Sequence, residues 1–503
     1  MSTATLITFI IYLVGMLGIG VWAYFQTRNL SDYILGGRKL GGLVTGLSAS
    51  ASDMSGWLLL GVPGAIYAGG LGEMWIAVGL VIGAYFNWKI TAPRLRVYTE
   101  RANNAITLPE YFTHRFEDNS NLLRVISALV ILIFFTVYVA SGLTAGAKLF
   151  EASFEMDYQV ALLIGAIVIV SYTFVGGFLA VSWTDVVQGL LMALALVIAP
   201  IVMFVELGSF ESIQAGVIAV DSTKTDWFAG KSASDFLLSI SFFSLMAWGL
   251  GYYGQPHLLA RFMAAQSIQH VHRARRIAMS WMVISMLGAL LVGYFAIAFF
   301  AGSEHAALLS GDSEKVFILA TQVLFNEWFA GFLLAAILAA VMSTIDSQLL
   351  VTSSAVTEDF YRVFFRRMAT DKELMWVGRI AVLLIAAIAI LIAMDKDAKV
   401  LGLVSNAWAG FGAAFGPVIV ISLLWKGMTR NGALAGMLGG AITVILWISF
   451  KQDMGGWMAD TYEMIPGVIV STVLILLLSK TQIPSITMVE RHSQVLADLK
   501  QKG

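Results

Sequence analysis

The chain contains no cysteine and few charged residues. Disulfides, thiolate nucleophiles and cysteine-ligated metals are therefore excluded. Asp, Glu, Lys and Arg make up only 13% of the 503 residues, whereas an average soluble domain carries about 25%. The formal net charge is −1, which lacks the basic excess expected of a protein that binds nucleic acid. With 58% hydrophobic residues and a mean hydropathy of +0.81, the composition predicts a polytopic membrane protein.

Common catalytic motifs are also absent. The sequence contains no Gly-x-Ser-x-Gly elbow, no His-Glu-x-x-His and no P-loop. We expect its six histidines to lie in loops, at span ends or in the tail; they are His114, His257, His270, His272, His305 and His492. Asp53 and Asp346 could form an intramembrane protease dyad, but their serine-rich surroundings suit ion ligation better. The sequence therefore does not predict an enzyme.

Hydropathy predicts about thirteen membrane-spanning helices within a single transmembrane domain covering residues 1–503. Their approximate ranges are 4–25, 40–67, 71–92, 121–150, 157–180, 183–207, 232–256, 274–300, 324–356, 375–394, 398–424, 431–450 and 459–478. The first run has no basic region before it and no small-residue cleavage site after it, so we expect it to be retained. The tail after Thr481 is expected to be short, polar and mobile.

The basic residues divide unevenly between the two sides of this arrangement. If the N-terminus lies outside, only seven of the 31 Lys and Arg residues flank the spans on the outside: Lys148, Lys224, Lys231, Lys315, Lys396, Lys399 and Lys451. Cytoplasmic flanks carry the excess of basic residues in membrane proteins. The sequence therefore predicts an outside N-terminus and a cytoplasmic C-terminus.

One apolar span, Leu47–Gly61, has a polar centre. It carries four serines together with Asp53 and Gly56. A charge at membrane depth costs at least about 2.5 kcal/mol, and non-helical backbone survives there only inside the protein or beside water. The favoured interpretation is a broken helix that forms a midplane binding site. The alternative is a tightly packed contact between small residues, with Asp53 paired to a neighbour.

A second interrupted span follows about two hundred residues later. In Trp248–His257, three glycines precede Pro256, which cannot continue a helix. Five spans separate the starts of the two broken helices, so the units they begin are inverted in the membrane. We expect one repeat over about 40–207 and the other over about 232–424. The peripheral helices would be about 4–25, 431–450 and 459–478.

The ninth span carries a third polar cluster, in Ala339–Gln348. Ser343 and Thr344 offer two hydroxyls from one turn, and the Ala340 carbonyl lies one turn earlier. Carbonyls released near Ala51 and Met54 in the first broken helix would complete the oxygen shell that sodium, as a hard cation, requires. Hydrogen bonding of the hydroxyls to their own or a neighbouring helix is the alternative.

Two further acids and one basic turn are open to more than one interpretation. Asp185 has two interpretations. It either forms a gate or a second site for a cation or proton, or it is an interfacial charge in contact with water. Asp346 and Ser347 would join Asp185 in a second oxygen cluster. Arg38, after two glycines, lies either in a hinge beside an inner gate or, as we favour, in an ordinary turn at the interface.

Several aromatic residues stand in small or polar surroundings. Trp248 and Tyr252 are spaced i, i+4 and would share a face if the helix persists. With Tyr138, and Trp57 nearby, they would line the apolar side of a pocket for a small solute. Packing or an interfacial position is the alternative.

Five strings in order resemble the sodium/solute symporters, with the match closest to bacterial members that transport proline. They are Asp32–Arg38, Ala51–Trp57, Gly176–Asp185, Gly251–His257 and Met342–Thr344. The resemblance extends over nearly all spans.

The resemblance implies an all-α, leucine-transporter-like core with a 5+5 inverted repeat and broken helices 2 and 7. It implies a sodium ion held by the carbonyls of Ala51, Met54 and Ala340 and the hydroxyls of Ser343 and Thr344. Coupling is implied for Asp53, Ser55 and Gly56, and a link to the ion pathway for Asp185. A proline pocket is implied at Tyr138, Trp248, Tyr252 and Pro256, with Trp57 beside it. Asp346 departs from the proline-transporting pattern, which leaves the ion stoichiometry open.

The expected function is inward sodium flow coupled to L-proline uptake by alternating access in a bacterial cytoplasmic membrane. A symporter for another small zwitterion or carboxylate, or a non-transporting sensor on the same fold, are the alternatives. Sodium, L-proline and the lipid bilayer are the expected partners, with no nucleic acid and no obligate protein partner.

Overall fold

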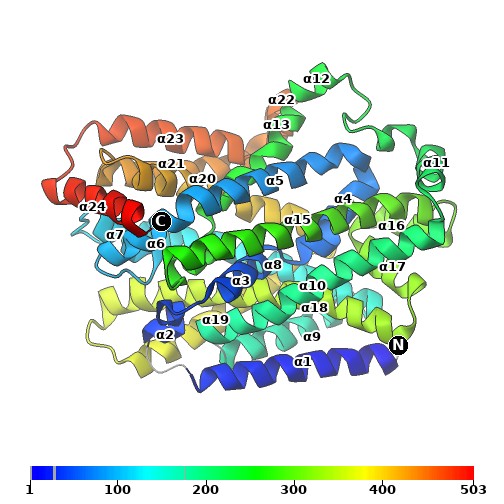
Figure 1. Cartoon of the computed structure of the whole chain (residues 1–503), viewed down its shortest axis with the longest axis horizontal. Coiled ribbons are helices and arrows are strands. Elements are labelled where there is room, and N and C mark those ends of the chain that lie inside the picture. Colours follow the sequence, from blue (N-terminus) through cyan, green and yellow to red (C-terminus); the bar gives the residue numbers. More distant parts are fainter. Residues whose placement is uncertain (1–2, 27–29, 176, 503) are drawn as a thin grey trace.

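The structure is a computed structural model that describes residues 3–26, 30–175 and 177–502. Within these ranges the chain forms helices and no strands, and Leu40 and Ala265 make an isolated parallel bridge. Nine of the described helical stretches are long and apolar enough to span a membrane, and three shorter apolar helices accompany them. The long helices lie side by side, along the horizontal direction of Figure 1. The structure is therefore that of an all-α polytopic membrane protein.

Each of the first six expected spans corresponds to a helix or an interrupted helix. In order, they are α1 (Thr3–Tyr24); α3 (Gly42–Asp53) with η2 (Trp57–Gly61) and α4 (Val62–Gly69); α5 (Trp75–Phe86) with η4 (Asn87–Thr91) and α6 (Ala92–Arg101); α8 (Leu122–Phe154); α9 (Tyr158–Val175); and α10 (Phe178–Leu207). The sixth helix begins five residues earlier than the sequence predicts. The glycine pair before it includes Gly176, which lies outside the described residues.

The remaining seven expected spans follow the same pattern. They are α13 (Ile240–Ala247) with η6 (Trp248–Gly254) and α14 (Pro256–Ala264); α15 (Ile268–Phe299); α18 (Glu327–Ser354) with η8 (Ala355–Phe365); α19 (Asp371–Ala393); α20 (Val400–Leu424); α21 (Arg430–Met454); and α23 (Met464–Ser479). Side chains cap several of these helices at residues typical of N-caps: Ser267 accepts from the His270 N–H, and Asn326 from the Phe329 N–H.

Short helices lie between the spans and at the two ends of the bundle. They are α2 (Leu30–Leu35), η1 (Gly36–Arg38), η3 (Gly70–Met74), α7 (Leu108–Arg115), α11 (Phe210–Val220), η5 (Ser222–Thr225), α12 (Ala233–Leu237), α16 (Glu304–Gly311), η7 (Ser313–Lys315), α17 (Val316–Leu324), α22 (Gly456–Asp460) and α24 (Ile486–Lys502). The N-terminus lies at the end that carries α11 and α16, and α24 lies at the opposite end beside α7 (Figure 1).

The tail after Thr481 differs from the expectation of a short mobile segment. Residues from Ile486 form α24, and Val495 on this helix is only 1% exposed. Arg101 on α6 makes an ion pair of 2.8 Å with Asp498. This segment is amphipathic rather than merely polar, and the apolar side of α24 packs against the rest of the protein.

α18 and α20 are the most enclosed of the long helices. In the most apolar 18-residue stretch of each helix, 83% of the residues are buried for α18 and 78% for α20, compared with 28% for α1. α18 has no polar side facing solvent between Ala330 and Ser354, so its serines, Asp346 and Gln348 all lie inside the protein. Polar groups in this position must be paired within the protein or with a ligand.

Candidate functional site

The first broken helix is interrupted where its serines and Asp53 predict. α3 ends at Asp53, and Met54 leaves the helical region with φ −90° and ψ 89°. The chain resumes as the π-helix η2 at Trp57. Gly56 packs against α8, because a Cβ at this position would lie 2.6 Å from the Ala145 Cβ. The break frees carbonyls that an intact helix would use internally.

Ser343, a predicted ion ligand on α18, contacts the end of α3 at this break. The Ser343 hydroxyl lies 2.7 Å from the Ala51 carbonyl oxygen and 3.1 Å from that of Ala340. Thr344 is 1% exposed, and its hydroxyl has no hydrogen-bond partner within the described part of the chain. Met54 follows the last residue of α3 directly. The Ser343 hydroxyl and the carbonyls of Ala51 and Ala340 thus meet at one buried point, where their oxygens suit a hard monovalent cation.

Asp53 connects this point with three of the predicted pocket aromatics. Its carbonyl oxygen lies 3.2 Å from the Trp57 indole nitrogen and 3.4 Å from the Tyr138 hydroxyl. Its carboxylate oxygen Oδ2 accepts a hydrogen bond of 2.6 Å from the Tyr252 hydroxyl. The Ser55 hydroxyl accepts from the Trp57 backbone N–H at 3.4 Å. We call Asp53, Trp57, Tyr138 and Tyr252 the Asp53 cluster.

The second broken helix does not persist as an α-helix. Trp248–Gly254 forms the 3₁₀ helix η6, and Gln255 is extended before Pro256 starts α14. With three residues per turn, positions i and i+4 lie about 120° apart. Trp248 and Tyr252 therefore point to different neighbours. Trp248 stacks on Tyr462 at 5.3 Å, and Tyr252 meets the edge of Trp408 at 5.0 Å.

Small residues let η6 lie directly against α20. A Cβ on Gly254 would approach the Phe411 carbonyl oxygen to 2.1 Å. The Trp408 indole donates to the Trp248 carbonyl at 2.8 Å. Sequence reasoning missed Trp408 because nothing local to it marks its contact with η6. The tertiary fold alone brings the two segments together.

Asp185 lies inside the protein, so its interpretation as an interfacial charge in contact with water is wrong. It is fully buried on α10, accepts from the Ser48 hydroxyl at 2.6 Å and pairs with Arg261 of α14 at 3.2 Å. Arg261 also donates to Ser347 on α18. Asp185 and Ser347 thus share Arg261 as a hydrogen-bond donor, so a protein cation lies between two members of the expected oxygen cluster.

Arg261 is a further residue that sequence reasoning missed. It is not one of the seven basic residues of the outside flanks, so the charge count assigns it to a cytoplasmic flank, yet its side chain is fully buried. Asp346 is fully buried near it and interacts with it electrostatically. A buried arginine is retained only with compensating charges and acceptors. The signal in the sequence was the presence of two acids at membrane depth, which require a positive partner.

His257 also departs from its expected place in a loop or at a span end. It lies in the first turn of α14, is fully buried, and meets the rings of Phe135 and Tyr138 at 5.5 and 6.1 Å. The break at Gln255 places it beside the Asp53 cluster. Pro256 indicated in the sequence where the helix starts, but it did not indicate that His257 is buried.

Arg38 joins three segments instead of lying in an ordinary interfacial turn. Its guanidinium donates to Thr99 on α6 at 3.1 Å and to the carbonyls of Met263 and Ala105 at 2.7 Å each. Burial, then the nearby Arg96, lowers the pKa of Arg38 to about 10. The loop that contains Arg38 is therefore fixed to α14 in this conformation.

An ion-pair cluster lies on the side of the bundle that the charge count places outside. Lys148 of α8 pairs with Glu314 at 2.6 Å and Asp312 at 3.0 Å, and Lys399 pairs with Asp312 at 2.9 Å. Burial alone would raise the pKa of Asp312, but the two lysines outweigh it and lower that pKa. Glu314 also accepts the N–H groups of Val400 and Leu401, capping α20.

Two helices interrupted at mid-length, one packed against the hydroxyls of the enclosed helix α18 and the other against the enclosed helix α20, define a polytopic membrane protein of the transporter class. Residues 33–440 match the model of the sodium:solute symporter family. The chain belongs to this family.

Curated relatives cover almost the whole chain. A "Sodium/proline symporter" of Salmonella typhimurium is 54% identical over 98% of this chain and 96% of its own length. One of Escherichia coli is 53% identical with the same coverage. A "High-affinity proline transporter PutP" of Bacillus subtilis is 50% identical over 93% of this chain and 97% of its own.

Solved structures share the fold. A Na⁺-coupled sialic acid symporter in a substrate-bound outward-open state matches with a TM-score of 0.76 and 19% identity, over 96% of this chain and 99% of that one. The nucleobase-cation-symport-1 family transporter Mhp1 matches with a TM-score of 0.53 and 14% identity, over 93% and 99%. At these identities the likeness shows the fold, which is of the leucine-transporter type, with the interruptions in its second and seventh spans. The protein is a multi-pass inner-membrane protein.

Proposed function

We propose that this protein couples inward sodium flow to L-proline uptake by alternating access. The main structural support for this proposal is the Asp53 cluster and the Ala51 carbonyl beside it. One short broken segment supplies a carbonyl to Ser343 of α18 and, two residues later, a carboxylate to Tyr252 of η6. A cation bound between α3 and α18 would thus fix the segment that holds the second broken helix. The relatives transport proline by name, and the chain spans nearly their full length.

In this function, sodium is bound by the carbonyls of Ala51, Met54 and Ala340 and by the hydroxyls of Ser343 and Thr344. Tyr138, Trp248, Tyr252 and Pro256, with Trp57, line the proline pocket. Asp53, Ser55, Gly56, Asp185 and Asp346 belong to the coupling machinery. We add Arg261 to the coupling residues because its buried ion pair with Asp185 joins α10 to α14.

Sodium shifts the conformational equilibrium only through tighter binding to one state. We infer that it binds the outward-facing state more tightly, so proline affinity rises with sodium and sodium affinity rises with proline by the same factor. Residues 40–207 and 232–424 form the two inverted repeats within one transmembrane domain. The N-terminus lies outside and the C-terminus in the cytoplasm, in agreement with their positions at opposite ends of the bundle (Figure 1).

The test is uptake of labelled L-proline into proteoliposomes that contain the purified protein, with and without an inward sodium gradient. We expect uptake that requires sodium and is lost in Ser343→Ala. Sodium binding without proline transport would favour another small zwitterion or carboxylate. Sodium-dependent proline binding without translocation would favour a sensor.

A further inference from the structure

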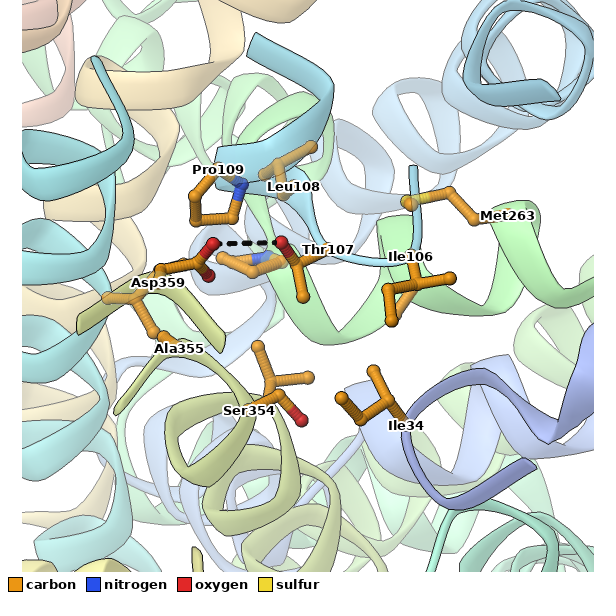
Figure 2. A pocket seen from close by; sticks show the side chains of 13 residues that line it. Ile34, Ile106, Thr107, Leu108, Pro109, Met263, Ser354, Ala355 and Asp359 are labelled. Carbon is orange, nitrogen blue, oxygen red and sulfur yellow. Dashed lines mark hydrogen bonds between the residues drawn. The ribbon is translucent and has the colours of Figure 1, made fainter. Parts of the chain in front are cut away.

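A small cavity is lined by Pro256 of α14 and by Leu108 and Pro109 at the start of α7, and Figure 2 shows residues of its wall. Its volume is about 30 Å³, enough for about one water molecule. Seven elements or segments contribute to its walls, including α2 with Ile34, the segment before α7 with Ile106, and α14 with Pro256. We call this space the lower chamber.

The lower chamber continues the path of the proposed proline pocket. Pro256, Ala260 and Met263 line it and share one face of α14. On α8, Ile131 lines the chamber, while Phe135 and Tyr138, one and two turns further on, contact His257 and the Asp53 cluster. The Asp53 cluster, through Tyr138, and the chamber, through Ile131, therefore lie two turns apart along α8.

Asp359 is the charged side chain in an otherwise apolar wall. Of the residues that line the chamber, only Thr107, Ser354 and Asp359 are polar. The Ser354 hydroxyl is used within its own helix, where it donates to the Leu350 carbonyl at 2.8 Å. Asp359 is fully buried on the π-helix η8. π-helical turns inside helices are frequent at functional sites.

One carboxylate oxygen of Asp359 is held and the other is not. Oδ1 pairs with Arg124 of α8 at 2.9 Å and accepts from the Thr107 hydroxyl at 3.3 Å, the contact drawn in Figure 2. Oδ2 is buried and has no hydrogen-bond partner within the described part of the chain. Such an acceptor costs free energy unless a donor reaches it. A secondary ammonium beside apolar methylene groups is the ligand that this wall complements.

Resting on the proposed function, we propose that the lower chamber is a second, transient binding site for proline on its way to the cytoplasm. Asp359 accepts a hydrogen bond from the ring ammonium through Oδ2, and the apolar wall contacts the pyrrolidine ring. In the structure the Thr107 hydroxyl and Asp359 are in contact in the wall of the chamber. Separating the segment before α7 from η8 would open the chamber.

The decisive comparison is between Asp359→Asn and the matched control Glu358→Gln. Glu358 is the neighbouring buried acid on η8, pairs with Arg362 at 3.1 Å and does not line the chamber. For Asp359→Asn we expect equilibrium binding of labelled proline with sodium to stay within about twofold of wild type, and uptake into proteoliposomes to fall at least tenfold. Glu358→Gln should change neither. Parallel losses of binding and uptake in Asp359→Asn, or unchanged uptake, would overturn the assignment.

A labelling experiment keeps the proposal testable if Asp359→Asn folds poorly. The chain contains no cysteine, so Ile106→Cys can be labelled uniquely in inside-out vesicles. We expect proline added from the cytoplasmic face without sodium to slow labelling at least threefold, with no effect on exposed Asn103→Cys. Equal rates at position 106 with and without proline refute the transient site. If wild-type protein shows no sodium-dependent proline binding, the proposed function fails independently of the chamber.

Discussion

Tyr252→Phe tests whether the Asp53 cluster connects the ion site to the proline pocket. The substitution removes the hydroxyl that lies 2.6 Å from Asp53 Oδ2 and keeps the ring that packs on the edge of Trp408. A hydrogen bond to a charged group contributes about 1.5–3 kcal/mol. At 1.4 kcal/mol for each factor of ten, its loss corresponds to a change of about 10- to 150-fold.

We therefore expect the gain in proline affinity produced by sodium to fall by at least about tenfold in Tyr252→Phe. Sodium binding measured without proline should remain close to wild type, because no expected ion ligand is altered. The assay is binding of labelled proline to purified protein across a sodium titration. Tyr253→Phe is the matched control, since Tyr253 is the next residue and lies half-buried on the same 3₁₀ helix.

If Tyr252→Phe retains the full effect of sodium on proline affinity, the hydroxyl does not transmit coupling. The reasoning is also refuted if sodium binding without proline falls as much as proline binding, because Tyr252 would then belong to the ion site itself.

The remaining predictions concern the ion site, the second acid on α18 and the C-terminal helix. Ser343→Ala removes a hydroxyl 2.7 Å from the Ala51 carbonyl. We expect the sodium concentration for half-maximal uptake to rise at least tenfold in this variant and to stay unchanged in the exposed control Ser222→Ala. If Ser343→Ala and wild type need the same sodium concentration, Ser343 does not belong to the ion site. Asp346→Ser should alter the Hill coefficient for sodium if Asp346 serves a second ion, and an identical coefficient assigns it to charge balance around Arg261. Burial, followed by Arg115, Lys426 and Arg94, lowers the pKa of His492 from 6.5 to about 4. The unfolded or undocked helix therefore binds a proton first as pH falls below about 6.5, and docking of α24 should weaken progressively down to pH 4. Protection of the amides of residues 486–502 against hydrogen exchange, measured relative to their intrinsic exchange rates at each pH, should decrease as pH falls through this window in wild type and not in His492→Phe; pH-independent protection in wild type would contradict the buried position of the imidazole.

The sequence determined the number and order of the spans because an apolar run of about 20 residues must bury its backbone hydrogen bonds in a helix. It also located both helix breaks. Serines and Asp53 compete with the α3 backbone, and Pro256 lacks the donor that would continue η6. These signals are local, so they can be read without knowing any neighbour. The clustering of basic residues in the flanks of the spans is also a local signal, and it predicted which side of the membrane each flank faces.

Only the tertiary structure decided which side chains meet. The pairing of Asp185 with Arg261 joins residues 76 positions apart, and no local pattern specifies it. Trp248 and Tyr252 diverge because η6 is wound as a 3₁₀ helix against α20, where Gly254 permits contact with the backbone. The same packing buries His257 and gives α24 a surface on which to dock. Periodicity along one chain specifies which residues share a face of a helix, but the neighbour of that face is set by how all the helices pack.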